Sequence, residues 1–195
     1  MNSPTVIVLA SGRGTRFSAS GGSTHKLQAL LAGKTVLQHT LDAVFASGLP
    51  WHLEQGGEPG MGDSIAAAVR ATAQSPGWLM LPADLPLIQA ETLRAVARSL
   101  CEHEVVVPVC QGQRGHPVGF SARCAAELQD LRGDQGAAGV VRRHAAFELA
   151  VNDVGCITDV DTLDDLRVAE RLLLSSDAEA PAAPPKSVPG RRSAR

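Results

Sequence analysis

Short hydrophobic runs alternate with segments of helical periodicity along most of the chain. Residues 5–9 consist of Thr5 and four hydrophobic residues, and hydrophobic residues also fill positions 78–81 and 105–107, as is typical of strands buried on both faces. Between these runs, hydrophobic residues recur at three- and four-residue spacing over residues 37–45 and 91–101, which predicts amphipathic helices. The alternation predicts an α/β fold, with a sheet covered by helices on both faces.

Local signals predict where several elements begin and end. The helix over 37–45 is expected to stop at Gly48, because glycine accepts the left-handed backbone of a helix end. Thr162 with Asp165 three residues later forms an N-cap signature, which predicts a last helix of about three turns. Residues 117–120 are expected to pair antiparallel with the hydrophobic strand that precedes them.

The length favours one domain. A chain of 195 residues and 20.3 kDa is a natural size for a single core. After Leu174 the composition changes to Ala, Pro and Ser with a basic end. We therefore expect a domain over residues 1–174 and a disordered tail over residues 175–195.

The composition argues against several kinds of binding partner and cellular location. A net charge of −2 gives no electrostatic support for binding nucleic acid or a membrane surface, and the absence of Tyr makes base stacking a poor fit. No two of the four cysteines stand in a C-x-x-C spacing, so we expect reduced thiols. The hydrophobic run at residues 6–10 is too short for a signal-peptide core or a membrane span, and a cytoplasmic location is expected.

The first hydrophobic run leads into a glycine-rich, basic loop over residues 10–17. Glycines let backbone N–H groups approach phosphate oxygens, and Arg13 and Arg16 add forked donors, so the loop is a candidate phosphate site. It lacks the Walker A spacing, and Phe17 stands where a dinucleotide fingerprint needs a small residue. The alternative is a tight turn with solvated arginines. Lys26 is close enough in sequence to reach a triphosphate, or is an ordinary surface lysine.

Acidic residues follow two other extended segments. Asp84 stands at the end of a buried strand, where open α/β sheets bind ligands, and its carboxylate suits Mg²⁺ shared with substrate phosphates. Its alternative role is to cap the helix that begins near Gln89. Asp159 and Asp161 point to the same side of an extended segment, so one of them is a second candidate ligand. Capping of the last helix is the alternative for Asp161.

Three polar loops with glycines separate the later elements: residues 60–64, 114–117 and 133–136. Each suits an ordinary turn, but loops between regular elements also tend to meet at one rim of a sheet. His116 is the histidine of interest, because it lies between a glycine and a proline rather than on a hydrophobic helix face. A general-base role is one interpretation of it.

Taken in order, these pieces resemble the MobA-like nucleotidyltransferases, most closely the molybdenum cofactor cytidylyltransferase branch. The matching pieces are Leu9 to Gly12 with Arg16 and Phe17, His25 to Leu27, Gly60 to Gly62 with Ser64, Leu81 to Pro86, Gly115 to Pro117, Gly133 and Asp134 with Gly136, and Asp159 to Thr162. The resemblance implies a Rossmann-like, mostly parallel sheet of the glycosyltransferase-A type. It also implies transfer of CMP from CTP, or another nucleoside triphosphate, to the terminal phosphate of molybdopterin cofactor, with release of pyrophosphate.

The resemblance also implies roles for individual residues. Lys26, Arg16 and Asp84 would be catalytic, and Asp84 would hold Mg²⁺ together with Asp161 or Asp159. The partners implied are the nucleotide, molybdopterin cofactor, and a molybdoenzyme or its maturation chaperone. The residues expected to bind the nucleotide are Leu9, Ala10, Ser11, Gly12, Arg13, Gly14, Thr15, Arg16, Lys26, Gly62, Ser64, His116 and Asp134.

Two positions and one segment depart from the family pattern. Ser11 stands where the cytidylyl branch usually has alanine and guanylyl relatives have glycine. The resemblance favours CTP over GTP. Residues 50–60 leave little room for an edge element, and Ala138 stands where relatives often have an arginine for the acceptor phosphate. Two alternatives stay open: transfer to another phosphorylated small molecule, and a non-catalytic carrier of nucleotide or molybdenum cofactor.

Overall fold

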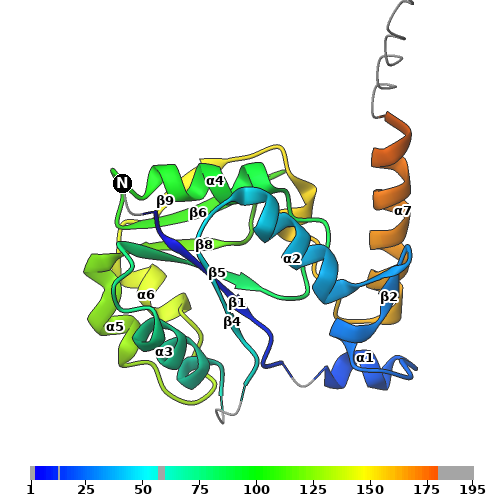
Figure 1. The fold of residues 1–195 in the computed structure, drawn as a ribbon, viewed down its shortest axis with the longest axis horizontal. Coiled ribbons are helices and arrows are strands. Elements are labelled where there is room, and N and C mark those ends of the chain that lie inside the picture. Colours follow the sequence, from blue (N-terminus) through cyan, green and yellow to red (C-terminus); the bar gives the residue numbers. More distant parts are fainter. Residues whose placement is uncertain (1–2, 13, 57–59, 180–195) are drawn as a thin grey trace, which may run out of the picture.

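The computed structural model describes residues 3–12, 14–56 and 60–179, and a seven-stranded sheet runs through their centre (Figure 1). The strands lie in the order β4-β1-β5-β8-β6-β7, and β9 pairs with β6. Their bounds are β1 Thr5–Leu9, β4 Trp51–Glu54, β5 Gly77–Pro82, β6 Val105–Cys110, β7 Gln113–Arg114, β8 Val118–Ser121 and β9 Phe147–Ala150.

The sheet is mostly parallel. Strand β1 pairs in parallel with β4 and β5, and β6 pairs in parallel with β9. Strand β8 is antiparallel to both β5 and β6, so these two strands point the same way. The antiparallel pairing expected for residues 117–120 is confirmed. Strand β4 supplies an edge element within residues 50–60, although residues 57–59 lie outside the described chain.

Helices cover both faces of the sheet, as expected (Figure 1). Helices α2 and α4 lie on one face, and α3, α5 and α6 lie on the other. The α-helices are α1 Thr15–Ala19, α2 Val36–Ser47, α3 Met61–Ala71, α4 Ala90–Ser99, α5 Ala125–Gln129, α6 Ala138–Arg143 and α7 Leu163–Glu179. The smaller elements are the 3-10 helices η1 Lys26–Gln28, η2 Ala122–Cys124 and η3 Val154–Ile157, and the hairpin of β2 Leu30–Leu31 with β3 Lys34–Thr35.

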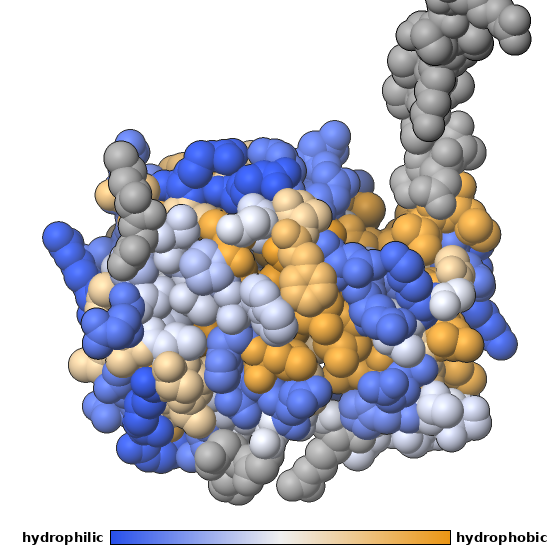
Figure 2. Space-filling view, viewed as in Figure 1, coloured by the Kyte–Doolittle hydropathy of each residue, from blue (hydrophilic) through white to orange (hydrophobic). Residues whose placement is uncertain are grey.

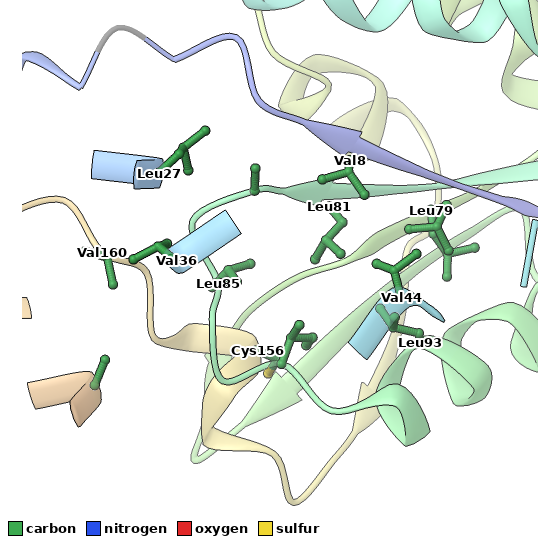
Figure 3. Packing of buried hydrophobic residues seen from close by; sticks show 14 of the residues in the cluster. Val8, Leu27, Val36, Val44, Leu79, Leu81, Leu85, Leu93, Cys156 and Val160 are labelled. Atoms are coloured by element: carbon green, nitrogen blue, oxygen red, sulfur yellow. The ribbon is translucent and has the colours of Figure 1, made fainter. Parts of the chain in front are cut away.

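Strand β1 divides two hydrophobic cores. Val6 and Val8 pack into the core on the α2 and α4 side, whereas Ile7 and Leu9 pack into the core on the α3 side. Figure 3 shows the first of these cores, where Val8 lies near side chains from β5 and α2. Because both faces of the strand are buried, the sequence shows an unbroken hydrophobic run there rather than alternation.

The helix boundaries follow from capping. Helix α2 begins with a capping box between Thr35 and Gln38 and ends at Gly48, whose φ of 69° is left-handed. At the start of α7, Asp165 accepts hydrogen bonds from the backbone N–H and the hydroxyl of Thr162, as the N-cap signature predicted.

Helix α7 is longer than expected. It spans 17 residues, against the predicted three turns, and continues past residue 174 to Glu179. The reason is that glycine and proline are absent from this stretch, and Pro181 is the first proline after it, so helical hydrogen bonds can continue. The remainder of the expected tail, residues 180–195, lies outside the described chain.

Hydrophobic side chains also reach the surface. Figure 2 shows hydrophobic residues across the centre of one face, the region where α2 and β4 lie in Figure 1. Phe45 of α2 and Trp51 of β4 are both exposed, and their rings meet edge to face with centroids 5.1 Å apart. Within the described residues, no helix is both long enough and hydrophobic enough to cross a membrane.

A histidine joins three elements on the α5 and α6 side. The Nδ1 atom of His144 lies 3.0 Å from Glu104, and its Nε2 atom lies 2.6 Å from Glu127. Both nitrogens face carboxylates, so the doubly protonated ring satisfies both contacts. These hydrogen bonds raise the pKa of His144 above its ordinary value.

This geometry predicts a stabilising contact that depends on pH. A raised histidine pKa adds stability that is fully present below the unfolded-state pKa of about 6.5 and is lost as the pH rises through the folded-state pKa. His144→Gln should therefore lower the unfolding midpoint more at about pH 6 than at about pH 9. Urea unfolding at the two pH values measures this. Arg167→Gln, which removes the guanidinium paired with Asp164 on α7, is the control and should cost the same at both.

Candidate active site

A cluster of charged side chains lies beyond the carboxyl ends of β1 and β5. The Nζ atom of Lys26 lies 2.5 Å from Oδ2 of Asp84 and 2.7 Å from Oδ1 of Asp161. The guanidinium of Arg16 donates to Oδ2 of Asp161 at 2.6 Å. Lys26 and Asp161 are 135 residues apart in sequence, so the fold assembles this cluster from distant segments.

The hydrophobic core holds the cluster in place. Leu27, Leu85 and Val160 are each the immediate neighbour of one of the charged residues, and all three are buried in the same core (Figure 3). Lys26 itself is buried, with 9% of its surface exposed. Core packing therefore places the segments that carry Lys26, Asp84 and Asp161 next to one another.

Lys26 and Asp161 stay charged near neutral pH. Burial alone would lower the pKa of Lys26, but its hydrogen bonds to Asp161 and Asp84 outweigh burial and raise that pKa. The hydrogen bond from Lys26 lowers the pKa of Asp161, and Arg16 adds to this effect. A lysine shared by two carboxylates is thus an ammonium that can instead neutralise an incoming phosphate.

The donors fit a divalent cation that a substrate helps to bind. Oδ1 of Asp84 is buried with no hydrogen-bond partner, while Asp84, Asp159 and Asp161 line one cavity of about 410 Å³. Among the described residues, no three His, Cys, Asp or Glu side chains converge to hold a metal ion on their own. Mg²⁺ commonly takes only one or two carboxylates and completes its shell with water and substrate phosphates. Asp84 and Asp161 are the better pair, because Lys26 already brings these two carboxylates together and Oδ1 of Asp84 has no partner.

The alternative capping roles belong to other residues. Asp153 accepts hydrogen bonds from the backbone of Gln89 at 3.0 Å and from the hydroxyl of Thr92 at 2.6 Å, so it caps α4. The interpretation of Asp84 as the cap of that helix is wrong. Thr162 caps α7 through reciprocal hydrogen bonds with Asp165, which leaves the Asp161 side chain to Lys26 and Arg16.

The glycine-rich loop lies against the charged cluster. Gly12, Gly14, Thr15, Arg16, Lys26 and Asp161 line a cavity of about 240 Å³. His25 fixes the loop, because its Nε2 atom donates to the carbonyl of Gly12 at 2.8 Å and its Nδ1 atom accepts from the backbone of Leu27. Gly14 is the N-cap of α1 and has a φ of 63°, a conformation that favours glycine. Arg13 lies outside the described residues.

Other predicted nucleotide contacts support the loop rather than line its cavity. The backbone of Ala10 bonds to Glu54 at 2.8 Å, and the hydroxyl of Ser11 accepts from that of buried Ser64 at 3.2 Å. Leu9 lines a different, hydrophobic cavity. Asp134 is exposed and lines neither cavity.

Two of the polar loops meet at one rim, as expected. The backbone N–H of Gly62 donates to the carbonyl of Gly133 at 2.7 Å, and Asp63 accepts from the N–H of Gly133 at the same distance. A Cβ atom on Gly62 would lie 2.6 Å from the carbonyl oxygen of Gln135. Gly62 is therefore required by the close approach of two backbones.

His116 lies where two cavities meet. It lines the cavity of Asp84 and a hydrophobic cavity of about 620 Å³ between α3 and α6. Its Nδ1 atom is buried without a hydrogen-bond partner. Burial lowers the pKa of His116, so the ring is neutral near pH 7.

The sequence interpretation missed Arg142. This arginine lines the hydrophobic cavity and stands four residues after Ala138, on the same face of α6. The available signal was the helical spacing from Ala138, where the resemblance implied an arginine.

Comparison with known proteins decides the family. The model of the MobA-like NTP transferase domain matches residues 42–147, more than half of the chain. This chain belongs to that family. The match contains Asp84, His116 and Asp134, whereas Arg16, Lys26 and Asp161 lie outside it.

The purine catabolism protein PucB of Bacillus subtilis is 28% identical to this chain over 127 residues. The match covers 63% of this chain and 62% of PucB, so it spans less than two thirds of that protein. The crystal structure of Rv0371c from Mycobacterium tuberculosis has a TM-score of 0.74 and 27% identity, covering 87% of this chain and 98% of the other. Its manganese complex has a TM-score of 0.69 and 26% identity, with the same coverage of both chains.

A third solved structure supports the fold alone. The molybdopterin-guanine dinucleotide biosynthesis protein A of Archaeoglobus fulgidus has a TM-score of 0.65 at 18% identity, over 88% of this chain and 99% of the other. The glycosyltransferase-A-like, mostly parallel fold expected from the sequence is thus confirmed.

The contacts of Gly62 predict a structural cost that is separate from ligand binding. Gly62→Ala should lower the free energy of unfolding by about 1–3 kcal/mol, because its Cβ meets backbone atoms that cannot yield easily. Gly139→Ala is the control, since its Cβ would have no neighbour nearer than 3.6 Å, and helix propensity should leave it unchanged or slightly stabilised. Urea unfolding without nucleotide measures both; equal stability of the two variants would show that Gly62 is not a packing residue.

Proposed function

We propose that this MobA-like nucleotidyltransferase moves CMP from CTP to the terminal phosphate of molybdopterin cofactor. A phosphate oxygen of the acceptor would attack the α-phosphorus of CTP, and the bond to the β-phosphate would break to release pyrophosphate. The observation that carries the proposal is the bridge from Lys26 to Asp84 and Asp161 beside the glycine-rich loop.

The chain's own groups suit this reaction. Backbone N–H groups of the loop and the guanidinium of Arg16 would bind the β- and γ-phosphates, and Lys26 would neutralise charge near the α-phosphate. Arg16 is well exposed at the mouth of the small cavity, where it can turn toward a ligand. Such a transfer requires alignment and charge neutralisation rather than a protein nucleophile.

A divalent cation completes the proposed site. Asp84 and Asp161 would hold Mg²⁺, with Asp159 lining the same cavity. When bound, the cation would neutralise the phosphate oxygens of the substrate. Support comes from the unpartnered, buried Oδ1 of Asp84 and from the manganese complex of Rv0371c.

Fewer observations support the identities of the nucleotide and of the acceptor. Ser11 favours CTP over GTP by its resemblance to the cytidylyl branch. A recipient molybdoenzyme or maturation chaperone and the cytoplasmic location stay predictions. The alternatives are another phosphorylated acceptor and a carrier that binds without turnover, and both differ from the proposal in measurable ways.

Pyrophosphate release with CTP, GTP and ATP, each with Mg²⁺ and reduced molybdopterin cofactor, tests the proposal directly. CTP should give the fastest release, and omission of the acceptor should abolish it. Release with another phosphorylated acceptor but not with molybdopterin cofactor would show that the other molecule is the acceptor. Nucleotide binding without any release would identify a carrier.

Removal of one carboxylate tests the metal assignment. Asp84→Asn should lower metal-dependent pyrophosphate release by about 100-fold or more, because it removes charge at the cation while keeping the shape of the side chain. The control is Asp42→Asn, an exposed carboxylate paired with Lys34 away from the cluster, which should keep full activity. Circular dichroism checks that both variants fold. Full activity of Asp84→Asn would reject Asp84 as a metal ligand.

A further inference from the structure

Strand β4 leaves one edge of the sheet open. Among the described strands, it pairs with β1 alone, and its other side has no neighbour. The carbonyls of Pro50 and Glu54 each accept a 2.8 Å hydrogen bond from the segment that contains β1. Because backbone groups alternate in direction along a strand, the N–H and C=O groups of Trp51 and Leu53 point away from the sheet. These groups can pair with a further strand.

One face of this open edge is hydrophobic. The register places Trp51 beside Val6 and Leu53 beside Val8, so both side chains lie on the α2 side of the sheet. Leu53 packs at the margin of the core, whereas 45% of Trp51 is exposed. Natural edge strands commonly carry charged side chains that discourage pairing with other chains. A tryptophan at such an edge instead favours a partner that covers it.

Hydrophobic side chains on α2 continue this surface. Leu37, Leu41 and Phe45 recur at four-residue spacing, which places them along one side of the helix. Phe45 is 54% exposed, and its ring meets that of Trp51 with centroids 5.1 Å apart. Figure 2 shows hydrophobic residues across this region, where α2 and β4 lie in Figure 1. The end of the helix and the strand edge thus share one exposed hydrophobic surface.

We propose that a second copy of this chain covers this surface, with the two β4 strands antiparallel and related by a two-fold axis at Leu53. The two sheets would join into one sheet, with both α2 helices on the same face. Leu53 would lie opposite Leu53 of the partner subunit, and the pair would exchange two backbone hydrogen bonds, because these groups point outward. Trp51 would lie opposite Gln55 of the partner subunit.

The charged side chains of β4 favour a second copy in this register. His52 and Glu54 lie 3.6 Å apart within one chain, on the face opposite Trp51. In the proposed pairing, His52 faces Glu54 of the partner subunit, and the symmetry repeats this contact. A two-fold axis at Glu54 would instead place two carboxylates opposite each other, which is unfavourable. A strand that complements itself fits a second copy better than an unrelated peptide.

This interface would lie beside the candidate active site without forming part of it. A Cβ atom on Gly56 would lie 3.4 Å from that of Ser11, so the chain leaving β4 passes the glycine-rich loop. The bridge of Lys26 with its carboxylates involves no residue of β4. The inference therefore does not depend on the proposed nucleotidyl transfer, and its test needs no nucleotide.

The mass of the full chain in solution tests the inference. Size-exclusion chromatography with light scattering should give twice the 20.3 kDa of one chain at high protein concentration. Trp51→Lys should give the mass of one chain, because lysine on an edge strand opposes pairing. Leu174→Lys is the control, since it replaces a side chain of α7 that is 58% exposed, and it should keep the dimer. Circular dichroism checks that both variants fold.

Disulfide trapping tests the register. All trapping variants carry Cys101→Ser, which removes the exposed native thiol. With oxidised glutathione as oxidant, Leu53→Cys should form a linked dimer, because opposed residues of a hydrogen-bonded pair have Cα atoms about 5.5 Å apart. Gln55→Cys is the control. Gln55 is exposed, so random collisions would link it at least as readily, but the proposed register keeps its two copies apart.

Three results would overturn the inference. A wild type with the mass of one chain at high concentration would leave this surface to a different protein partner. A dimer that Trp51→Lys leaves intact would place the interface elsewhere. Linking of Gln55→Cys as fast as Leu53→Cys would show random collision rather than paired strands.

Discussion

Lys26 joins two carboxylates in a place that is largely closed to water. Without its ammonium, Asp84 and Asp161 would face each other as like charges, which raises carboxyl pKa values and disfavours the folded arrangement. Removing one partner of a buried ion pair commonly costs about 3–5 kcal/mol. The lysine thus stabilises the fold as well as forming part of the candidate site. Because the cluster lies at a cavity wall, Lys26 can bind a phosphate in place of its carboxylate partners.

The core sets the positions of these charges. Side chains on the two faces of β1 pack into different cores. The core beneath α2 and α4 contains the hydrophobic sequence neighbours of Lys26, Asp84 and Asp161. Strand ends of a parallel sheet meet at one edge, so short loops suffice to gather chemically active groups there. The opposite core, beneath α3 and α6, instead leaves a hydrophobic cavity at the same edge.

The sequence predicts those parts of the structure that depend on neighbours along the chain. The buried strand at residues 5–9, the end of α2 at Gly48 and the Thr162 N-cap all rest on local patterns, and all are confirmed. The cap of α4 by Asp153 was not predictable, because that contact spans 64 residues and follows from the packing of η3. The pairing of Lys26 with particular carboxylates was not predictable for the same reason. The sequence identifies the charged residues as candidates, but only the fold shows which of them are in contact.

The first turn of α3 supports segments on both sides of the acidic cluster. Ser64 holds the loop after β1 through Ser11, and Gly62 and Asp63 hold the segment around Gly133 that precedes α6. One short stretch of rigid helix therefore fixes the spacing between two otherwise separate loops. A displacement of α3 would move both loops together. The first turn of α3 therefore sets the distance between the entrances to the small polar cavity and the hydrophobic cavity.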